Sequence, residues 1–135
     1  MKFRKEGNCF IVKLEPGDEV IASLKKFCEE QNVKSGFVQG IGGASECVLG
    51  AFDGKTKKYA EKTFHGNFIE ILSLAGDVTE TGPHLHAVIG GHDFACSGGH
   101  VISMTIGVTA ELFLFPSEAI PRELDPRFDL KLMKL

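Results

Sequence analysis

Three histidines, His84, His86 and His100, have the spacing of metal ligands. His84 and His86 are two residues apart in an apolar, β-branched run, so on a strand both imidazoles would project from the same face. Glycine-rich turns follow this run, and a hairpin return would bring His100 alongside the pair. Three neutral imidazoles on one face can hold one divalent ion. Zinc is the metal that this ligand set favours first, with iron, nickel or cobalt as alternatives.

The register of that hairpin determines which histidines meet. With a three-residue loop centred on His92, we expect His84 to face His100 and His86 to face Gly98. Opposed residues have Cβ atoms about 4.5–5.5 Å apart, which lets three imidazoles reach one ion at about 2.0–2.1 Å. A two-residue loop or a bulge at the glycines would change the register, so the sequence permits this site without forcing it. Three protein ligands leave a fourth coordination position open.

Other polar residues near the histidines are weaker candidates for chemistry. We expect His92 to be exposed at the turn tip and His65 to lie at the surface, and we do not count Cys96 among the ligands although its parity places it near the trio. The alternative interpretation of the trio is a partly exposed polar cluster. The catalytic residues stay unknown, because no spacing selects one of the acidic side chains that could approach: Asp77, Glu80, Asp93 and Glu111.

A glycine-rich segment, residues 40–44, resembles a phosphate-binding loop only superficially. Ser45 stands where the G-x-G-x-x-G pattern requires its third glycine, and a strand rather than a helix follows. No helix N-terminus would therefore face a phosphate. We predict a bend between two strands and no nucleotide cofactor.

Composition limits the classes of protein to which this chain can belong. Its 135 residues suit one domain over residues 1–135, and 43% hydrophobic with 24% charged residues is typical of a globular protein. The net charge of −3 does not support DNA binding through phosphates, and we expect the basic run at residues 55–58 to be a solvated turn. The four cysteines form no close pair, which favours reduced thiols. We find no signal peptide and no membrane span, and expect a cytoplasmic protein.

The elements that must position the histidines are mostly strands. Residues 19–31 carry one apolar stripe, which predicts a helix with Asp18 as its N-cap. The loop at residues 116–126 contains three prolines. Alternating or continuous apolar runs predict strands at residues 8–14, 36–41, 45–52, 68–75, 84–89, 100–115 and 128–132. We therefore expect an α+β fold, a largely antiparallel β-sheet packed against one main α-helix in a single domain.

Five short motifs in one order resemble a known family. They are residues 17–20 (Gly-Asp-Glu-Val), 40–44 (Gly-Ile-Gly-Gly-Ala) leading into 48–50 (Val-Leu-Gly), 70–76 (Glu-Ile-Leu-Ser-Leu-Ala-Gly), 83–86 (Pro-His-Leu-His) and 97–101 (Ser-Gly-Gly-His-Val). This set resembles the PPC domain (plants and prokaryotes conserved domain, DUF296), in its stand-alone prokaryotic form. The resemblance implies an α+β homotrimer in which some prokaryotic members hold a metal at the His-x-His and Gly-Gly-His segments, which supports the same three ligands.

The resemblance also raises DNA binding. Plant relatives join this domain to AT-hook segments, and bacterial and archaeal members are often labelled DNA-binding for that reason. This chain contains no Arg-Gly-Arg-Pro core and no basic tail, so the element that would enter the minor groove is missing.

Three hypotheses follow from the sequence. The first is a homotrimeric, metal-binding PPC module that binds a small ligand or a protein partner, in a regulatory role. The alternative is a small zinc-dependent enzyme that uses the open coordination position of the three-histidine site. A third, DNA binding by the trimer, requires basic surface from three chains to converge.

Overall fold

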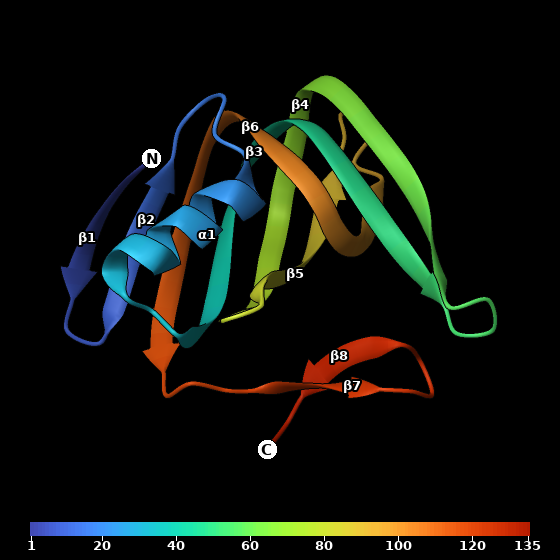
Figure 1. The fold of residues 1–135 in the computed structure, drawn as a ribbon. Coiled ribbons are helices and arrows are strands. Elements are labelled where there is room, and N and C mark those ends of the chain that lie inside the picture. The colour runs from blue at the N-terminus through green and yellow to red at the C-terminus, as the bar shows by residue number, and fades with distance from the viewer.

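The computed structural model describes residues 1–66 and 69–135, and it places most of them in one antiparallel sheet with a single helix (Figure 1). The six strands have the spatial order β1-β2-β6-β3-β4-β5, and β5 also pairs with β6, so that β3, β4, β5 and β6 close on one another. The strands are β1 (Lys2–Glu6), β2 (Cys9–Leu14), β3 (Ser35–Asp53), β4 (Lys58–Thr79), β5 (Gly82–Gly90) and β6 (Cys96–Ser117). The predicted α+β fold is confirmed.

Helix α1 (Val20–Gln31) lies across one face of the sheet (Figure 1). Its apolar stripe is fully buried at Val20, Leu24 and Phe27, because these positions recur at helical spacing toward the core. The predicted N-cap was wrong. Glu19 caps the helix by accepting a hydrogen bond from the Ala22 backbone N–H at 2.6 Å. The carboxylate of Asp18 instead binds the N-terminal ammonium at 2.8 Å and accepts a hydrogen bond from the Glu15 N–H at 2.8 Å.

The glycine-rich segment lies inside one strand and not between two. Residues 36–41 and 45–52 form a single strand, β3, which passes through register shifts at Gly40/Gly42 and Ala44/Glu46. A Cβ atom at Gly42 would lie 2.3 Å from the Thr109 carbonyl oxygen of β6. Glycine is therefore required there because β6 approaches closely, and the shifts bend β3 without ending it.

Two ends of the chain form strands that the sequence did not predict. β1 is exposed and charged, but it pairs with β2 through its backbone, and Phe3 packs edge-on against Phe27 at 5.0 Å between ring centroids. The proline-containing loop includes β7 (Arg122–Asp125), which was not predicted. It pairs with β8 (Leu130–Met133), which overlaps the strand predicted at residues 128–132. This separate two-stranded C-terminal hairpin runs beneath the main sheet in Figure 1. Phe68, the predicted first residue of one strand, lies outside the described residues.

Two smaller expectations can be compared with the structure. The basic run at residues 55–58 is exposed, as predicted; residues 55–57 lie in the turn between β3 and β4, and Lys58 begins β4. Cys47 is buried, Cys9 and Cys28 are half-buried, and none of them is in a disulfide within the described chain. Burial raises the pKa of the Cys28 and Cys47 thiols to about 11, so both are protonated at neutral pH. No described helix has the length and apolar character needed to cross a membrane.

Candidate metal centre

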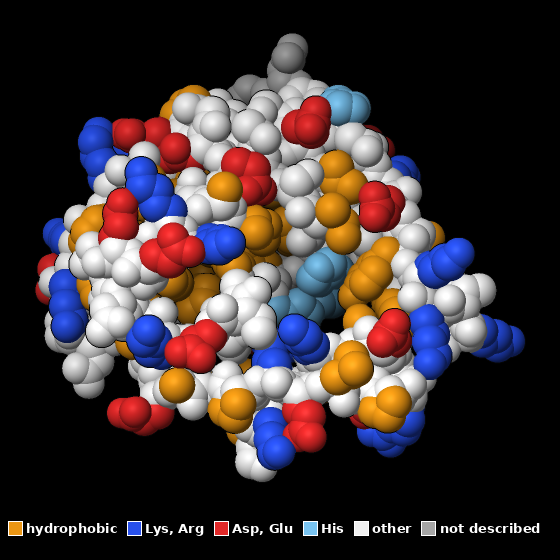
Figure 2. Space-filling view, viewed as in Figure 1, with side chains coloured by type: hydrophobic (Ala, Val, Ile, Leu, Met, Phe, Trp, Pro, Cys, Tyr) orange, Lys and Arg blue, Asp and Glu red, His pale blue; other side chains and the backbone are white. Residues whose placement is uncertain are grey.

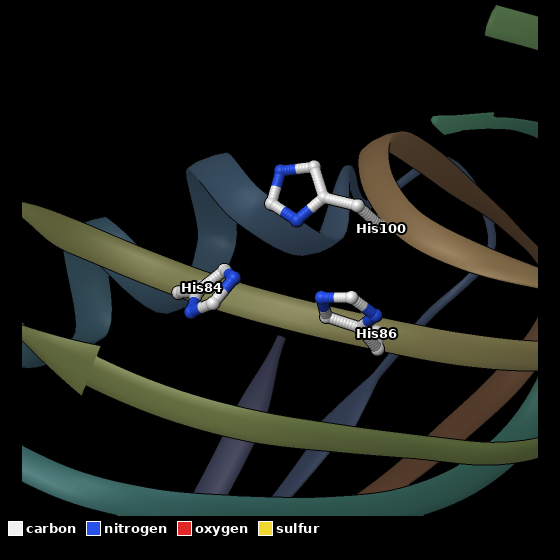
Figure 3. A group of neighbouring side chains, drawn as sticks. All are labelled: His84, His86 and His100. Carbon is white, nitrogen blue, oxygen red and sulfur yellow. The ribbon is translucent and has the colours of Figure 1, made fainter. Parts of the chain in front are cut away.

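The three histidines meet on one face of the β5–β6 hairpin. Their ring centroids are 5.4 Å apart for His84 and His86, 5.2 Å for His84 and His100, and 5.4 Å for His86 and His100. One nitrogen from each ring lies within 4.8 Å of the other two. Figure 3 shows the rings turned toward a common centre, two from β5 and one from β6.

The predicted register of the hairpin was wrong by two residues. His86, not His84, faces His100, and Val88 faces Gly98. The cause is a five-residue loop at residues 91–95, in which the Phe94 backbone N–H donates to Gly91 O at 3.0 Å and Phe94 has a φ of 60°. Because a shift of two residues preserves which face a side chain occupies, the three histidines still share one face.

Strand alternation separates the histidines from the core. On β5, Leu85, Ala87 and Ile89 are buried, while His84 is half-buried and His86 is exposed on the other face. His100 begins the buried part of β6 and is half-buried. The histidines therefore lie on the outer face of strands whose inner face is packed in the core. This packing fixes the strand backbone, and so the positions of the imidazoles at the surface.

Burial and neighbouring charges favour the neutral form of two of the rings. Burial lowers the pKa of His84 below its ordinary value of 6.5; Asp77 opposes this shift, and the Arg122 guanidinium and His86 reinforce it. Burial likewise lowers the pKa of His100, assisted by His84 and His86. A neutral imidazole is the form that binds a metal.

One ring nitrogen of the trio lacks a hydrogen-bond partner. Nδ1 of His100 is buried and has no hydrogen-bond partner among the described residues. A buried nitrogen left unpaired costs free energy, unless something else binds it. Nitrogens around a tetrahedral zinc ion lie about 3.3 Å apart at a bond length of about 2.05 Å, so modest ring rotations would bring this donor set to one ion. The residues present therefore fit a divalent transition metal.

Asp77 and Arg122 adjoin the trio. Nδ1 of His84 lies 3.7 Å from Asp77 Oδ2 and 3.4 Å from Arg122 Nη2, and Arg122 also donates to Asp77 Oδ1. The Arg122 side chain is only 8% exposed and reaches Thr79 Oγ1 at 3.3 Å and the Lys131 carbonyl at 3.0 Å. Sequence reasoning named Asp77 without selecting it and missed Arg122, which lies 45 residues from Asp77 in a segment predicted to be a loop.

The other candidate residues lie apart from the trio. Glu80 pairs with Lys34 at 4.0 Å, the Asp93 carboxylate accepts from the Ala95 N–H within the hairpin loop, and Glu111 is exposed opposite Ile41. Two further residues are exposed as expected: His65, whose Nδ1 is 3.0 Å from Glu46 Oε2, and His92 at the hairpin loop. Cys96 is also exposed.

The fold and the cluster together define a class: a small antiparallel β domain with one helix and a three-histidine group on a strand face. A family model of the Plants and Prokaryotes Conserved (PCC) domain matches residues 1–118. The chain belongs to this family, so the resemblance drawn from the five motifs is confirmed.

Solved structures share the fold over nearly the whole chain. A "putative DNA-binding protein" from Bacteroides thetaiotaomicron has a TM-score of 0.92 at 32% identity, with 98% of this chain and 96% of that chain covered. A metal-containing protein from Archaeoglobus fulgidus has a TM-score of 0.85 at 31% identity, with 100% of each chain covered. Both neighbours are therefore stand-alone prokaryotic chains of this fold. The descriptions as DNA-binding and as metal-containing apply to those two proteins.

A longer curated protein contains a related segment. The bifunctional protein GlmU from Synechococcus sp. (strain JA-3-3Ab) is 31% identical over 108 residues, which is 78% of this chain. This chain spans 17% of the length of that protein. The similarity therefore concerns one segment of it.

Proposed function

We propose that this protein is a homotrimeric metal-binding domain in which His84, His86 and His100 hold a divalent transition metal, zinc first, and leave one position for a ligand. The observation that carries the proposal is the convergence of three imidazole nitrogens within 4.8 Å on one face of a hairpin. The ligand would be a small molecule or a group of a protein partner, in a regulatory role. The relative from Archaeoglobus fulgidus, 31% identical and metal-containing, supports a metal in this fold.

Asp77 supplies what a metal-bound His84 needs on its other side. A ligating histidine usually donates its second ring N–H to a carboxylate, which fixes the tautomer and orients the ring. Asp77 Oδ2 lies 3.7 Å from Nδ1 of His84, so a small movement of the ring would bring them into hydrogen-bond distance and leave Nε2 for the ion. Arg122 holds the same carboxylate through its other oxygen.

An exposed apolar stripe supports assembly into a trimer. On the face of β3 and β6 that α1 does not cover, Phe37, Ile41, Phe113 and Phe115 are 46–58% exposed. The β3–β6 register brings Phe37 opposite Phe115, so the side chains form one patch. Contiguous apolar surface of this kind marks an interaction site, and a second copy of this chain is the partner that we propose. Sedimentation that gives a monomer would contradict it.

Metal binding is tested by elemental analysis of tag-free protein. We expect about one zinc per chain for the wild type and a loss of most of it in the double variant His84→Ala/His86→Ala. His65→Ala is the matched control, because this exposed histidine pairs with Glu46 away from the trio. Equal metal content in the wild type and the double variant would refute the proposed site.

The alternative is a zinc-dependent enzyme, and the open coordination position favours it. A zinc ion on three histidines lowers the pKa of a bound water to about 7. Asp77 lies close enough to His84 to orient that ring toward the ion. A screen of hydrolase and lyase substrates with metal-loaded and chelated protein distinguishes the two functions. Metal-dependent turnover would favour the enzyme, and its absence the binding module.

DNA binding is the weaker proposal for the trimer. The net charge is −3, and the basic run at residues 55–58 is short and exposed. Phosphate contacts need clustered cations, so three converging turns would have to supply them. A gel-shift titration at physiological salt tests this, with no retardation expected.

A further inference from the structure

Two histidines of the trio line a hollow that has one wall outside the matched family domain. The hollow has a volume of about 250 Å³, and His84 and His100 are among its lining residues, whereas His86 is not. Figure 2 shows histidine side chains within this depression, with Lys and Arg side chains along its lower edge and an acidic side chain at its lower right rim. The family match ends at residue 118, so the C-terminal hairpin adds a wall beyond it. The described lining residues are Tyr59, Thr81, Gly82, Pro83, His84, His100, Arg122, Leu130, Lys131 and Leu132.

The charged side chains of the described lining are all basic. Arg122 and Lys131 line the hollow, and none of the lining residues given above is Asp or Glu. Asp77, the carboxylate nearest to the trio, is already paired with Arg122. A divalent ion on the histidines would add two positive charges at the base. Such a hollow attracts anions, although the chain as a whole carries a net charge of −3.

Several of the other lining residues are apolar, and the hollow leaves room for a small molecule. Pro83, Leu130 and Leu132 line the hollow, and the Tyr59 ring packs against His100 at 5.2 Å between centroids. A volume of about 250 Å³ is just below the roughly 300–1,000 Å³ typical of sites for drug-sized ligands, so the hollow suits a small molecule.

We propose that this hollow binds a small organic anion with an apolar body. One anionic oxygen takes the open position of the metal, the Lys131 ammonium neutralises the charge, and Pro83 and Tyr59 contact the body. Lys131 is on the face of the C-terminal hairpin that carries Arg122, because it is two residues from Met133, the partner of Arg122 in the strand register. This deepens the proposed function and rests on it.

The test uses cobalt as a spectroscopic metal and benzoate as the probe. Co²⁺-loaded protein is first shown to hold about one ion per chain, and benzoate, phenyl phosphate and the neutral isostere benzamide are then titrated while the visible spectrum is recorded. We expect saturable changes with an anion and none with benzamide. Tighter binding of benzoate would indicate a carboxylate ligand, and tighter binding of phenyl phosphate would indicate a phosphate ligand.

Two variants test the hairpin wall. Lys131→Met keeps the apolar stem and should weaken anion binding about tenfold, as expected for a lost charge-assisted contact. Lys134→Met is the matched control, because Lys134 pairs with Glu123 at 2.7 Å on the same hairpin and is not a lining residue. We expect no change in its affinity.

The outcomes separate this inference from the metal site itself. Cobalt that binds while neither anion alters the spectrum would overturn the ligand proposal and leave the metal intact. Benzamide binding as tightly as benzoate, or Lys131→Met without effect, would also overturn it. Failure of the wild type to bind cobalt would instead refute the proposed function.

Discussion

Two hairpins border the same hollow, and they are held in place by different forces. The β5–β6 hairpin belongs to the main sheet, and its inner face is fixed by buried side chains such as Leu85 and Ile89. The C-terminal hairpin is a separate sheet, and its contacts with the rest include Arg122 with Asp77 and the Lys57 ammonium with the Pro126 carbonyl oxygen at 3.1 Å. Apolar burial positions the histidines, whereas a few hydrogen bonds position the wall opposite them.

The largest expected effect concerns the core behind the histidines. Leu85 is fully buried, so Leu85→Ala should lower the free energy of unfolding by about 2–5 kcal/mol. Leu124 in β7 is 55% exposed, and Leu124→Ala should cost no more than about 1 kcal/mol. Urea unfolding at one fixed protein concentration measures both, because assembly makes stability depend on concentration. Equal losses would break the contrast between the hairpins.

Arg122 should have an intermediate effect because it connects the two hairpins. Arg122→Met removes a nearly buried guanidinium and leaves Asp77 without its partner, so it should cost about 1–3 kcal/mol of stability. Metal affinity should fall about 10–100-fold, as for other losses of the group that holds a ligand in place. Calorimetry with zinc and thermal unfolding measure the two effects.

Arg127→Met provides the control for this variant. Arg127 is exposed and pairs with Asp125 within the C-terminal hairpin, so its loss should change neither quantity measurably. If Arg122→Met behaves like Arg127→Met, the C-terminal hairpin does not support the metal centre.

Much of this arrangement could be predicted from the sequence where a local pattern encodes it. The helical stripe Val20, Leu24 and Phe27 and the strand parity of the three histidines both depend on short-range periodicity. The histidines share one face as predicted, although the loop is two residues longer than expected, because a shift of two residues does not change the face that a side chain occupies. Arg122 could not be found in this way, since it contacts Asp77 from a proline-rich segment 45 residues away and no local pattern encodes that contact.

The smallest expected effect is the response of the metal-free protein to acid. The pKa values of His84 and His100 are lowered in the folded chain below 6.5, mainly by burial. As the pH falls below about 6.5, the unfolded chain therefore binds more protons than the folded one, and the free energy of unfolding decreases. Chelated wild type should lose stability between that pH and the folded pKa values. His84→Gln/His100→Gln should lose less, and identical curves would contradict the assigned shifts.

The central claim, that the β5–β6 hairpin is built to hold one metal ion, is tested most directly by anomalous X-ray diffraction. Crystals of tag-free protein supplied with zinc should be measured on both sides of the zinc absorption edge. We expect one anomalous peak per chain at about 2.0–2.1 Å from a nitrogen of each of His84, His86 and His100, with a fourth position open to water or a ligand. Zinc bound elsewhere on the chain, with no peak among these three rings, would contradict the account.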